Sequence, residues 1–144
     1  MNDKQIEENR YDNRAKLLIE SESFNYNNDL PIYLKQVYNF YFDLLKEQDI
    51  ESKVLEIGAG MGEKTSSLLD MSFKVTSTDI SSKSVEVMRN KFSKYSNFSA
   101  EVADMEKLPF NNESFDVVCS AGSLSYGDNT VVMNEIYRVL KQGG

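Results

Sequence analysis

Short apolar runs and longer amphipathic stretches alternate along the second half of the chain. Four short runs rich in apolar or β-branched residues predict strands: 53–57, 74–78, 98–102 and 115–120. Three longer segments repeat apolar residues every three or four positions and predict helices: 62–71, 81–95 and 129–140. This alternation favours an α/β fold, in which helices cover both faces of a parallel sheet.

The N-terminal part of the chain follows a purely helical pattern instead, so we treat 1–52 as a helical cap on a domain that spans 53–144. A polar helix is predicted for 4–20, and its sparse apolar positions are Ile6, Leu17, Leu18 and Ile19. The stretch 21–29 is rich in Ser and Asn and predicts a loop.

A second helix is predicted for 31–47, with Asp29 as its possible N-cap and Pro31 in its first turn. One stripe of apolar residues at helical spacing runs along it: Leu34, Val37, Tyr38, Tyr41, Leu44 and Leu45. Three further aromatics predict a second buried face: Tyr33, Phe40 and Phe42.

The topology of the predicted sheet follows from the handedness of its connections. Right-handed crossovers order the strands as third, second, first and fourth, which is a Rossmann-like, doubly wound parallel sheet of order 3-2-1-4. In such a sheet ligands bind at the carboxyl ends of the strands, at the switch point between the first and fourth strands. Candidate binding residues should therefore lie directly after the strands.

A glycine-rich turn, EIGAGMG at 56–62, follows the first predicted strand. Glycines permit positive φ and close approach of a ligand to the backbone, although a tight strand-to-helix turn is the simpler interpretation. A dinucleotide site would need a glycine at position 63, but Glu63 stands there and Glu56 precedes the turn. These carboxylates would repel a pyrophosphate and favour a ligand with a sulfonium and an ammonium group. The glycine spacing also excludes a P-loop.

Two aspartates follow the next two predicted strands. Asp79 lies 21 residues after Gly58, where a carboxylate can accept both hydroxyls of a ribose; a helix cap is the alternative role. Asp104 can accept a hydrogen bond from an adenine amino group, or it can be a turn residue. Ile80 and Met105 would place apolar surface on either side of an adenine ring.

Composition narrows the classes of function further. The 144 residues suit a single domain, and the net charge of -7 disfavours nucleic acid while tolerating a cationic ligand. The absence of histidine and the single cysteine, Cys119, exclude an internal disulfide and remove the commonest zinc ligand and general base, so no metal is expected. No apolar run could cross a bilayer and the polar N-terminus is no signal peptide, so we expect a cytoplasmic protein without membrane contact.

Together these residues resemble the class I S-adenosylmethionine-dependent methyltransferases of the small-molecule type. The matching pieces occur in the order and at the spacing of the family: VLEIGAGMGEKT (54–65), VTSTDIS (75–81), ADMEKLPFNNESFDVVCSAGSLSY (103–126) and NEIYRVLKQGG (134–144). They cover nearly all of 53–144, whereas 1–52 matches only as a generic helical cap.

The resemblance implies S-adenosylmethionine as cofactor and assigns roles to individual positions. The implied cofactor residues are Glu56, Gly58, Ala59, Gly60, Asp79, Ile80, Asp104, Met105, Ser120 and Ala121. Among them, Ser120 and Ala121 would offer backbone groups to the methionine ammonium. Ser125 and Tyr126 would lie near the methyl group and the substrate. Tyr11 is a further candidate for shaping the substrate pocket, with a packing or surface aromatic as its other interpretation.

The sequence departs from the family at its C-terminus, because the family sheet continues past the LKQGG segment. An incomplete sheet would leave an edge of the fourth strand unpaired, and we expect a fragment or a homodimer that pairs this edge. Methyl transfer to a small molecule is the leading hypothesis. A non-catalytic module that binds S-adenosylmethionine or S-adenosylhomocysteine is the alternative, and a nucleotide-dependent oxidoreductase is disfavoured by Glu63. The sequence identifies neither the acceptor nor a catalytic base, and it predicts that Cys119 is a buried, unreactive thiol.

Overall fold

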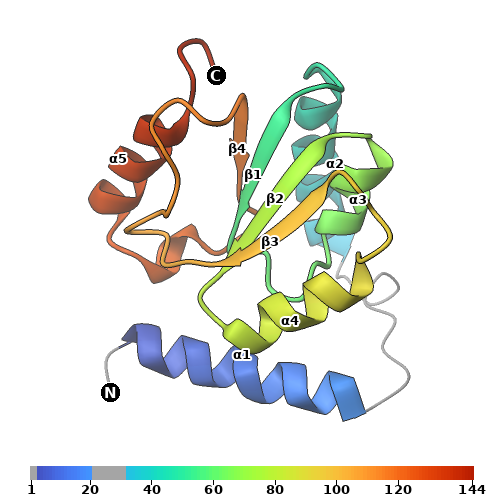
Figure 1. The fold of residues 1–144 in the computed structure, drawn as a ribbon, viewed down its shortest axis with the longest axis vertical. Coiled ribbons are helices and arrows are strands. Elements are labelled where there is room, and N and C mark those ends of the chain that lie inside the picture. The colour runs from blue at the N-terminus through green and yellow to red at the C-terminus, as the bar shows by residue number, and fades with distance from the viewer. Residues whose placement is uncertain (1–2, 21–31) are drawn as a thin grey trace.

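The fold was examined in a computed structural model, which describes residues 3–20 and 32–144 (Figure 1). Five α-helices are present in this part of the chain: α1 (Asp3–Glu20), α2 (Ile32–Lys46), α3 (Thr65–Asp70), α4 (Ser82–Lys91) and α5 (Asn129–Val139). The strands are β1 (Lys53–Ile57), β2 (Lys74–Asp79), β3 (Phe98–Val102) and β4 (Val117–Cys119), and a 3₁₀ turn, η2 (Leu124–Tyr126), precedes α5. The helices and strands follow the predicted order. The 3₁₀ turn η2 is the described element that the sequence pattern did not predict.

The sheet has the predicted topology. Its strands are ordered β3-β2-β1-β4 and every pairing is parallel, with Val54 of β1 opposite Val75 of β2 and Val117 of β4. β4 is shorter than predicted, and Phe115, which precedes it, forms an isolated parallel bridge with Leu140 after α5. Within the described residues β4 is an edge strand. Its pairing with a second copy of the chain stays a prediction.

Two apolar clusters lie on opposite faces of the sheet, as a doubly wound fold requires. On one face, side chains of β1, β2 and β3 pack against α3, α4 and the end of α2: Leu45, Val54, Leu68, Leu69, Phe73, Val75, Val85, Met88, Phe92 and Ala100. On the other face Leu55 and Ile57 of β1 pack against Phe115 and Val139, next to α5. Figure 1 shows α5 and α3 on opposite sides of the strands.

The predictions for α2 and α4 need correction in detail. Leu45 is buried, but Val37, Phe40 and Leu44 are exposed, so α2 does not bury two faces. Only its last turns reach the apolar cluster, through Leu45 and its neighbours. The helix predicted for 81–95 ends at Lys91. The predicted loop 21–29 and the cap and first turn at Asp29 and Pro31 lie outside the described residues.

No helix in the described part of the chain has both the length and the hydrophobicity that a membrane span requires.

Helix α1 crosses the carboxyl-terminal side of the sheet and packs beside α4 (Figure 1). Ala15 is fully buried in this contact region, whereas Ile6 and Leu17 are exposed. Polar contacts join the helix to three separate strand ends. Lys4 Nζ lies 2.7 Å from Asp104 Oδ2, Arg14 lies 3.9 Å from Glu63, and Asp12 accepts a hydrogen bond from the Ser81 hydroxyl.

Ser81 connects two helices and should stabilise the fold through both. Its Oγ accepts a hydrogen bond from Ser84 N at 3.0 Å as the N-cap of α4, and the same hydroxyl donates to Asp12 of α1. We expect Ser81→Ala to lower the free energy of unfolding by about 1 kcal/mol or somewhat more, measured by urea denaturation. Ser82→Ala, at the exposed neighbouring position, is the control and should change it by less than about 0.5 kcal/mol. Equal losses in the two variants would contradict the capping role.

Candidate cofactor site

The glycine turn after β1 brings the backbone close to another loop. Gly58, Gly60 and Gly62 have positive φ values of 64°, 59° and 79°. A Cβ atom on Gly58 would lie 2.0 Å from Ser123 Oγ, so only glycine lets the segment after β4 approach this closely. Ser123 in turn donates a hydrogen bond to Ile57 O at 3.0 Å. The turn is therefore held between the ends of β1 and β4.

Asp79 ends β2 and is 6% exposed. Its Oδ2 accepts from Gly60 N at 2.8 Å and its Oδ1 accepts from Ser81 N at 2.9 Å. The carboxylate thus links the glycine turn to the start of α4, while Ser81 is the N-cap. Burial raises the pKa of Asp79, and its two backbone hydrogen bonds act in the opposite direction.

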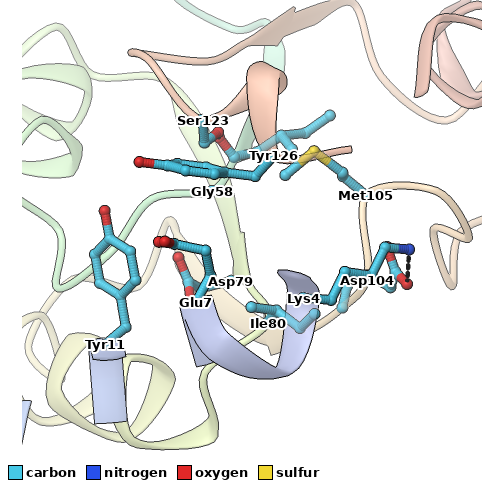
Figure 2. Close-up of a pocket in the computed structure, with 12 residues that line it drawn as sticks. Lys4, Glu7, Tyr11, Gly58, Asp79, Ile80, Asp104, Met105, Ser123 and Tyr126 are labelled. Carbon is cyan, nitrogen blue, oxygen red and sulfur yellow. Dashed lines mark hydrogen bonds and ion pairs between the residues drawn. The ribbon is translucent and has the colours of Figure 1, made fainter. Parts of the chain in front are cut away.

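Asp79 faces a pocket between α1 and the strand ends, which we call the Asp79 pocket (Figure 2). Twelve residues line it: Lys4, Glu7, Tyr11, Ile57, Gly58, Asp79, Ile80, Ala103, Asp104, Met105, Ser123 and Tyr126. Figure 2 shows the rings of Tyr11 and Tyr126 and the Asp79 and Glu7 carboxylates around one space. The wall is mostly apolar, with a few carboxylates and hydroxyls that converge on the space, which is the usual composition of a small-molecule site.

A second pocket, the Glu56 pocket, adjoins the first and shares Gly58 and Tyr11 with it. Its lining residues are Tyr11, Arg14, Tyr38, Glu56, Gly58, Ala59, Gly60, Glu63, Lys64 and Ala121. Two carboxylates and two cations stand around this pocket, whereas the Asp79 pocket has several carboxylates, apolar groups and a single cation, Lys4. Positive and negative ligand groups can therefore both find a partner in the Glu56 pocket.

Glu56 is the most buried of these ionisable groups, at 1% exposure. Its Oε2 accepts hydrogen bonds from Thr65 Oγ1 at 2.5 Å and Ser77 Oγ at 2.7 Å. Burial raises the pKa of Glu56 to about 7, although both hydroxyls favour the charged form. Near neutral pH the charge of this carboxyl thus depends on what lies beside it, and a cation in the pocket would ionise it.

Most of the predicted site residues meet around the two pockets. The residues that line one or both are Tyr11, Glu56, Gly58, Ala59, Gly60, Asp79, Ile80, Asp104, Met105, Ala121 and Tyr126. Ser120 and Ser125 line neither. The Ser120 hydroxyl lies 2.8 Å from Ser123 Oγ. Ser125 is exposed, whereas its neighbour Tyr126 lines the Asp79 pocket. The two side chains differ because successive residues of a 3₁₀ turn point about 120° apart.

Five residues that sequence reasoning missed line the Asp79 pocket: the polar Lys4, Glu7 and Ser123 and the apolar Ile57 and Ala103. Lys4 and Glu7 stand on one side of α1 with Tyr11, at the spacing of three and four residues that brings side chains together on a helix. That spacing was visible in the sequence. What the sequence could not show is that α1 returns to the carboxyl ends of the strands.

Asp104, expected beside an adenine amino group, has protein partners in this structure. Its Oδ2 accepts from Lys4 Nζ at 2.7 Å and its Oδ1 accepts from Glu106 N at 2.9 Å. Lys4 also lies 2.5 Å from Glu106 Oε2. The carboxylate keeps capacity for further hydrogen bonds, since each oxygen can accept more than one.

Cys119 lies in β4 and is 8% exposed. Burial raises the pKa of its thiol to about 12. A thiol with this pKa carries almost no thiolate at neutral pH, which agrees with the prediction that it is unreactive.

Comparison with known proteins identifies the family. The profile of the family described as "Methyltransferase domain" matches residues 54–144. Demethylmenaquinone methyltransferase of Chlorobaculum parvum is 34% identical over 100 residues, which cover 68% of this chain and 40% of that protein. Sarcosine/dimethylglycine N-methyltransferase of Aphanothece halophytica is 32% identical over 127 residues, covering 81% of this chain and 44% of the relative.

Among solved structures, the PH0226 protein of Pyrococcus horikoshii superposes with a TM-score of 0.67 at 29% identity, over 81% of this chain and 57% of that one. The chain thus spans less than half the length of the two curated relatives above and somewhat more than half of this structure. The match over 54–144 includes the glycine turn and both strand-end aspartates. The chain belongs to the methyltransferase domain family, the class I S-adenosylmethionine-dependent methyltransferases, and S-adenosylmethionine is its cofactor.

Proposed function

We propose that the chain binds S-adenosylmethionine across the Asp79 and Glu56 pockets and transfers its methyl group to a small-molecule acceptor that reaches the site beside Tyr126. The observation that carries this proposal is that the two pockets share Gly58 and Tyr11 in their walls while the rest of their linings differ as the two halves of the cofactor do.

The Asp79 pocket suits the adenosine part of the cofactor. The Asp79 carboxylate keeps one acceptor direction on each oxygen for ribose hydroxyls, beyond its bonds to Gly60 and Ser81. Ile80, Ala103 and Met105 supply apolar and polarisable surface for the adenine ring.

The Glu56 pocket suits the amino acid part. Glu56 and Glu63 can stabilise an ammonium group, and Arg14 and Lys64 provide cations for a carboxylate. Gly58 and Gly60 leave bare backbone between the two halves, and side chains there would meet Ser123 and Glu63.

The bound cofactor supplies a methyl group on a sulfonium, whose charge already activates it toward a nucleophile. The protein's part is then to hold and align the acceptor and to exclude water. Tyr11 lines both pockets and Tyr126 lines the Asp79 pocket, where the two rings can hold the acceptor and exclude water (Figure 2). Burial raises the pKa of Tyr11, so its hydroxyl stays protonated and remains available as a hydrogen-bond donor.

The net charge and the carboxylates of both pockets support an uncharged or cationic small acceptor over a nucleic acid. Proteins similar to this chain carry names for quinone and amine substrates, which agree with a small acceptor without choosing one.

Isothermal titration calorimetry with S-adenosylmethionine, S-adenosylhomocysteine and NAD tests the proposal. We expect the two adenosyl ligands to bind and NAD to give no heat, because the acidic turn repels a pyrophosphate. Transfer of a labelled methyl group to a panel of quinols, amines and sterols then tests catalysis. Binding of NAD alone would refute the cofactor assignment. Adenosyl binding with no transfer to any acceptor would favour the non-catalytic module.

A further inference from the structure

Glu7 places in the Asp79 pocket a carboxylate of which one oxygen has no donor in the described part of the chain. It belongs to α1, and its side chain is 18% exposed. Its Oε2 is buried and has no hydrogen-bond partner among the residues that the structure describes. Its other oxygen, Oε1, lies 3.4 Å from Nη1 of Arg10, a side chain that is 67% exposed. A buried carboxylate oxygen without a donor destabilises the fold, so its presence in a pocket indicates a donor that the ligand brings.

The nearest cation on the pocket side does not serve Glu7. Lys4 stands one turn earlier on the same helix, and its ammonium binds Asp104 and Glu106 at 2.7 and 2.5 Å. Figure 2 shows the Lys4 side chain directed toward Asp104, and Glu7 and Asp79 both line the pocket. These two carboxylates therefore line one pocket, and Lys4 is bound to other carboxylates, so a ligand that can donate more than one hydrogen bond suits this pocket.

A ribose offers such donors, since its two neighbouring hydroxyls each donate one hydrogen bond. Asp79 already accepts one backbone N–H on each oxygen, whereas Glu7 Oε2 accepts none. We infer that Glu7 and Asp79 share the ribose hydroxyls of the adenosyl group, Asp79 from the sheet and Glu7 from α1. The inference rests on the proposed function. It makes α1 a part of the cofactor site.

Glu7→Ala tests the inference when its binding is compared across ligands that differ by one hydroxyl. Calorimetry would use S-adenosylhomocysteine and its 2′-deoxy and 3′-deoxy analogues. We expect the variant to bind S-adenosylhomocysteine roughly tenfold or more weakly than the wild type, as for a lost hydrogen bond to a charged group. For one of the two deoxy analogues, the variant and the wild type should bind within about twofold of each other, because the hydroxyl that Glu7 accepts is then absent.

Thermal unfolding of the ligand-free protein separates binding from structure. Glu7→Ala removes a buried, unpartnered oxygen, so the midpoint should be equal to or above that of the wild type. Glu8→Ala removes the same charge one residue later, where the side chain lines neither pocket, and should leave the affinity unchanged. Glu7→Gln, which keeps an acceptor oxygen, should fall between wild type and Glu7→Ala in affinity.

Several outcomes would overturn the inference. They are an unchanged affinity of Glu7→Ala for S-adenosylhomocysteine, an equal loss for all three ligands, and a lowered midpoint that explains the loss as misfolding. Unchanged affinity with impaired methyl transfer would place Glu7 against the acceptor instead. A wild-type chain that binds no adenosyl ligand would refute the proposed function as well, whereas tight wild-type binding with no Glu7 effect refutes only this inference.

Discussion

Raising the pH from about 5 to about 8 should lower the free energy of unfolding by about 3 kcal/mol through Glu56 alone. The ordinary pKa of this carboxyl is 4.5, and burial raises it to about 7 in the folded chain. The folded state therefore holds the proton more tightly than the unfolded state. The stabilisation is complete below the unfolded pKa and is lost as the pH rises through the folded pKa. One pKa unit corresponds to about 1.4 kcal/mol, which gives the size of the effect.

Urea denaturation of the ligand-free chain at several pH values measures this loss, and Glu56→Gln is the matched control. The glutamine keeps an oxygen that can accept from the Thr65 and Ser77 hydroxyls and has no titrating proton. Asp79 also has a raised pKa, so the wild type alone does not isolate Glu56. The difference between wild type and variant does isolate it. A wild-type curve that runs parallel to that of Glu56→Gln between these pH values would contradict the buried, protonated state.

The same carboxyl links stability to the proposed function. A cationic ammonium beside Glu56 would favour its charged form, so S-adenosylmethionine should bind with release of a proton below about pH 7. Without ligand, the fold avoids a buried charge because Glu56 keeps its proton. With ligand, the ammonium group stabilises the charged carboxylate.

Asp79→Ala should weaken the binding of S-adenosylhomocysteine by about 1–3 kcal/mol, which is roughly 10- to 100-fold. The variant loses the proposed ribose acceptor. It also leaves Gly60 N and Ser81 N without the oxygens that fix the glycine turn and the start of α4. The loss should therefore exceed that of Asp79→Asn, which keeps one carbonyl oxygen in place. Calorimetry on variants that unfold cooperatively measures the affinities.

Asp70→Ala serves as the control for charge, because Asp70 is exposed at the end of α3 and lines neither pocket. It should bind S-adenosylhomocysteine as the wild type does. If Asp79→Asn folds and also retains wild-type affinity, the ribose assignment is wrong, whatever the turn contributes to stability.

The order of helices and strands could be predicted because each element is encoded locally. The apolar run Lys53–Ile57 and the apolar spacing in Ser82–Lys91 depend only on neighbouring residues. Sheet order followed from the handedness of crossovers, which L-amino acids impose on any parallel sheet. Asp79 and Asp104 were found for the same reason, since carboxyl ends of neighbouring parallel strands meet at one edge.

Contacts between distant segments could not be predicted in the same way. The amphipathic pattern of α2 predicted two buried faces, yet Val37 and Leu44 are exposed, because burial depends on which turns of a helix meet the sheet. Phe115 forms an isolated bridge with Leu140, a contact between segments 25 residues apart. The local sequence pattern shows which side chains could be buried. Tertiary packing decides which of them are buried.

By itself the sequence determined the fold class, the strand order, the glycine turn and the carboxylates that suggest a cationic adenosyl ligand. Only the tertiary structure decided that α1 crosses the carboxyl ends of the strands, bringing Lys4, Glu7 and Tyr11 to the Asp79 pocket from about 70 to 100 residues away in sequence. The physical reason is that strand ends are positioned by regular hydrogen bonding between neighbours. The place of a polar helix such as α1 is set by a few specific contacts, to Ser81, Glu63 and Asp104, which no local pattern specifies.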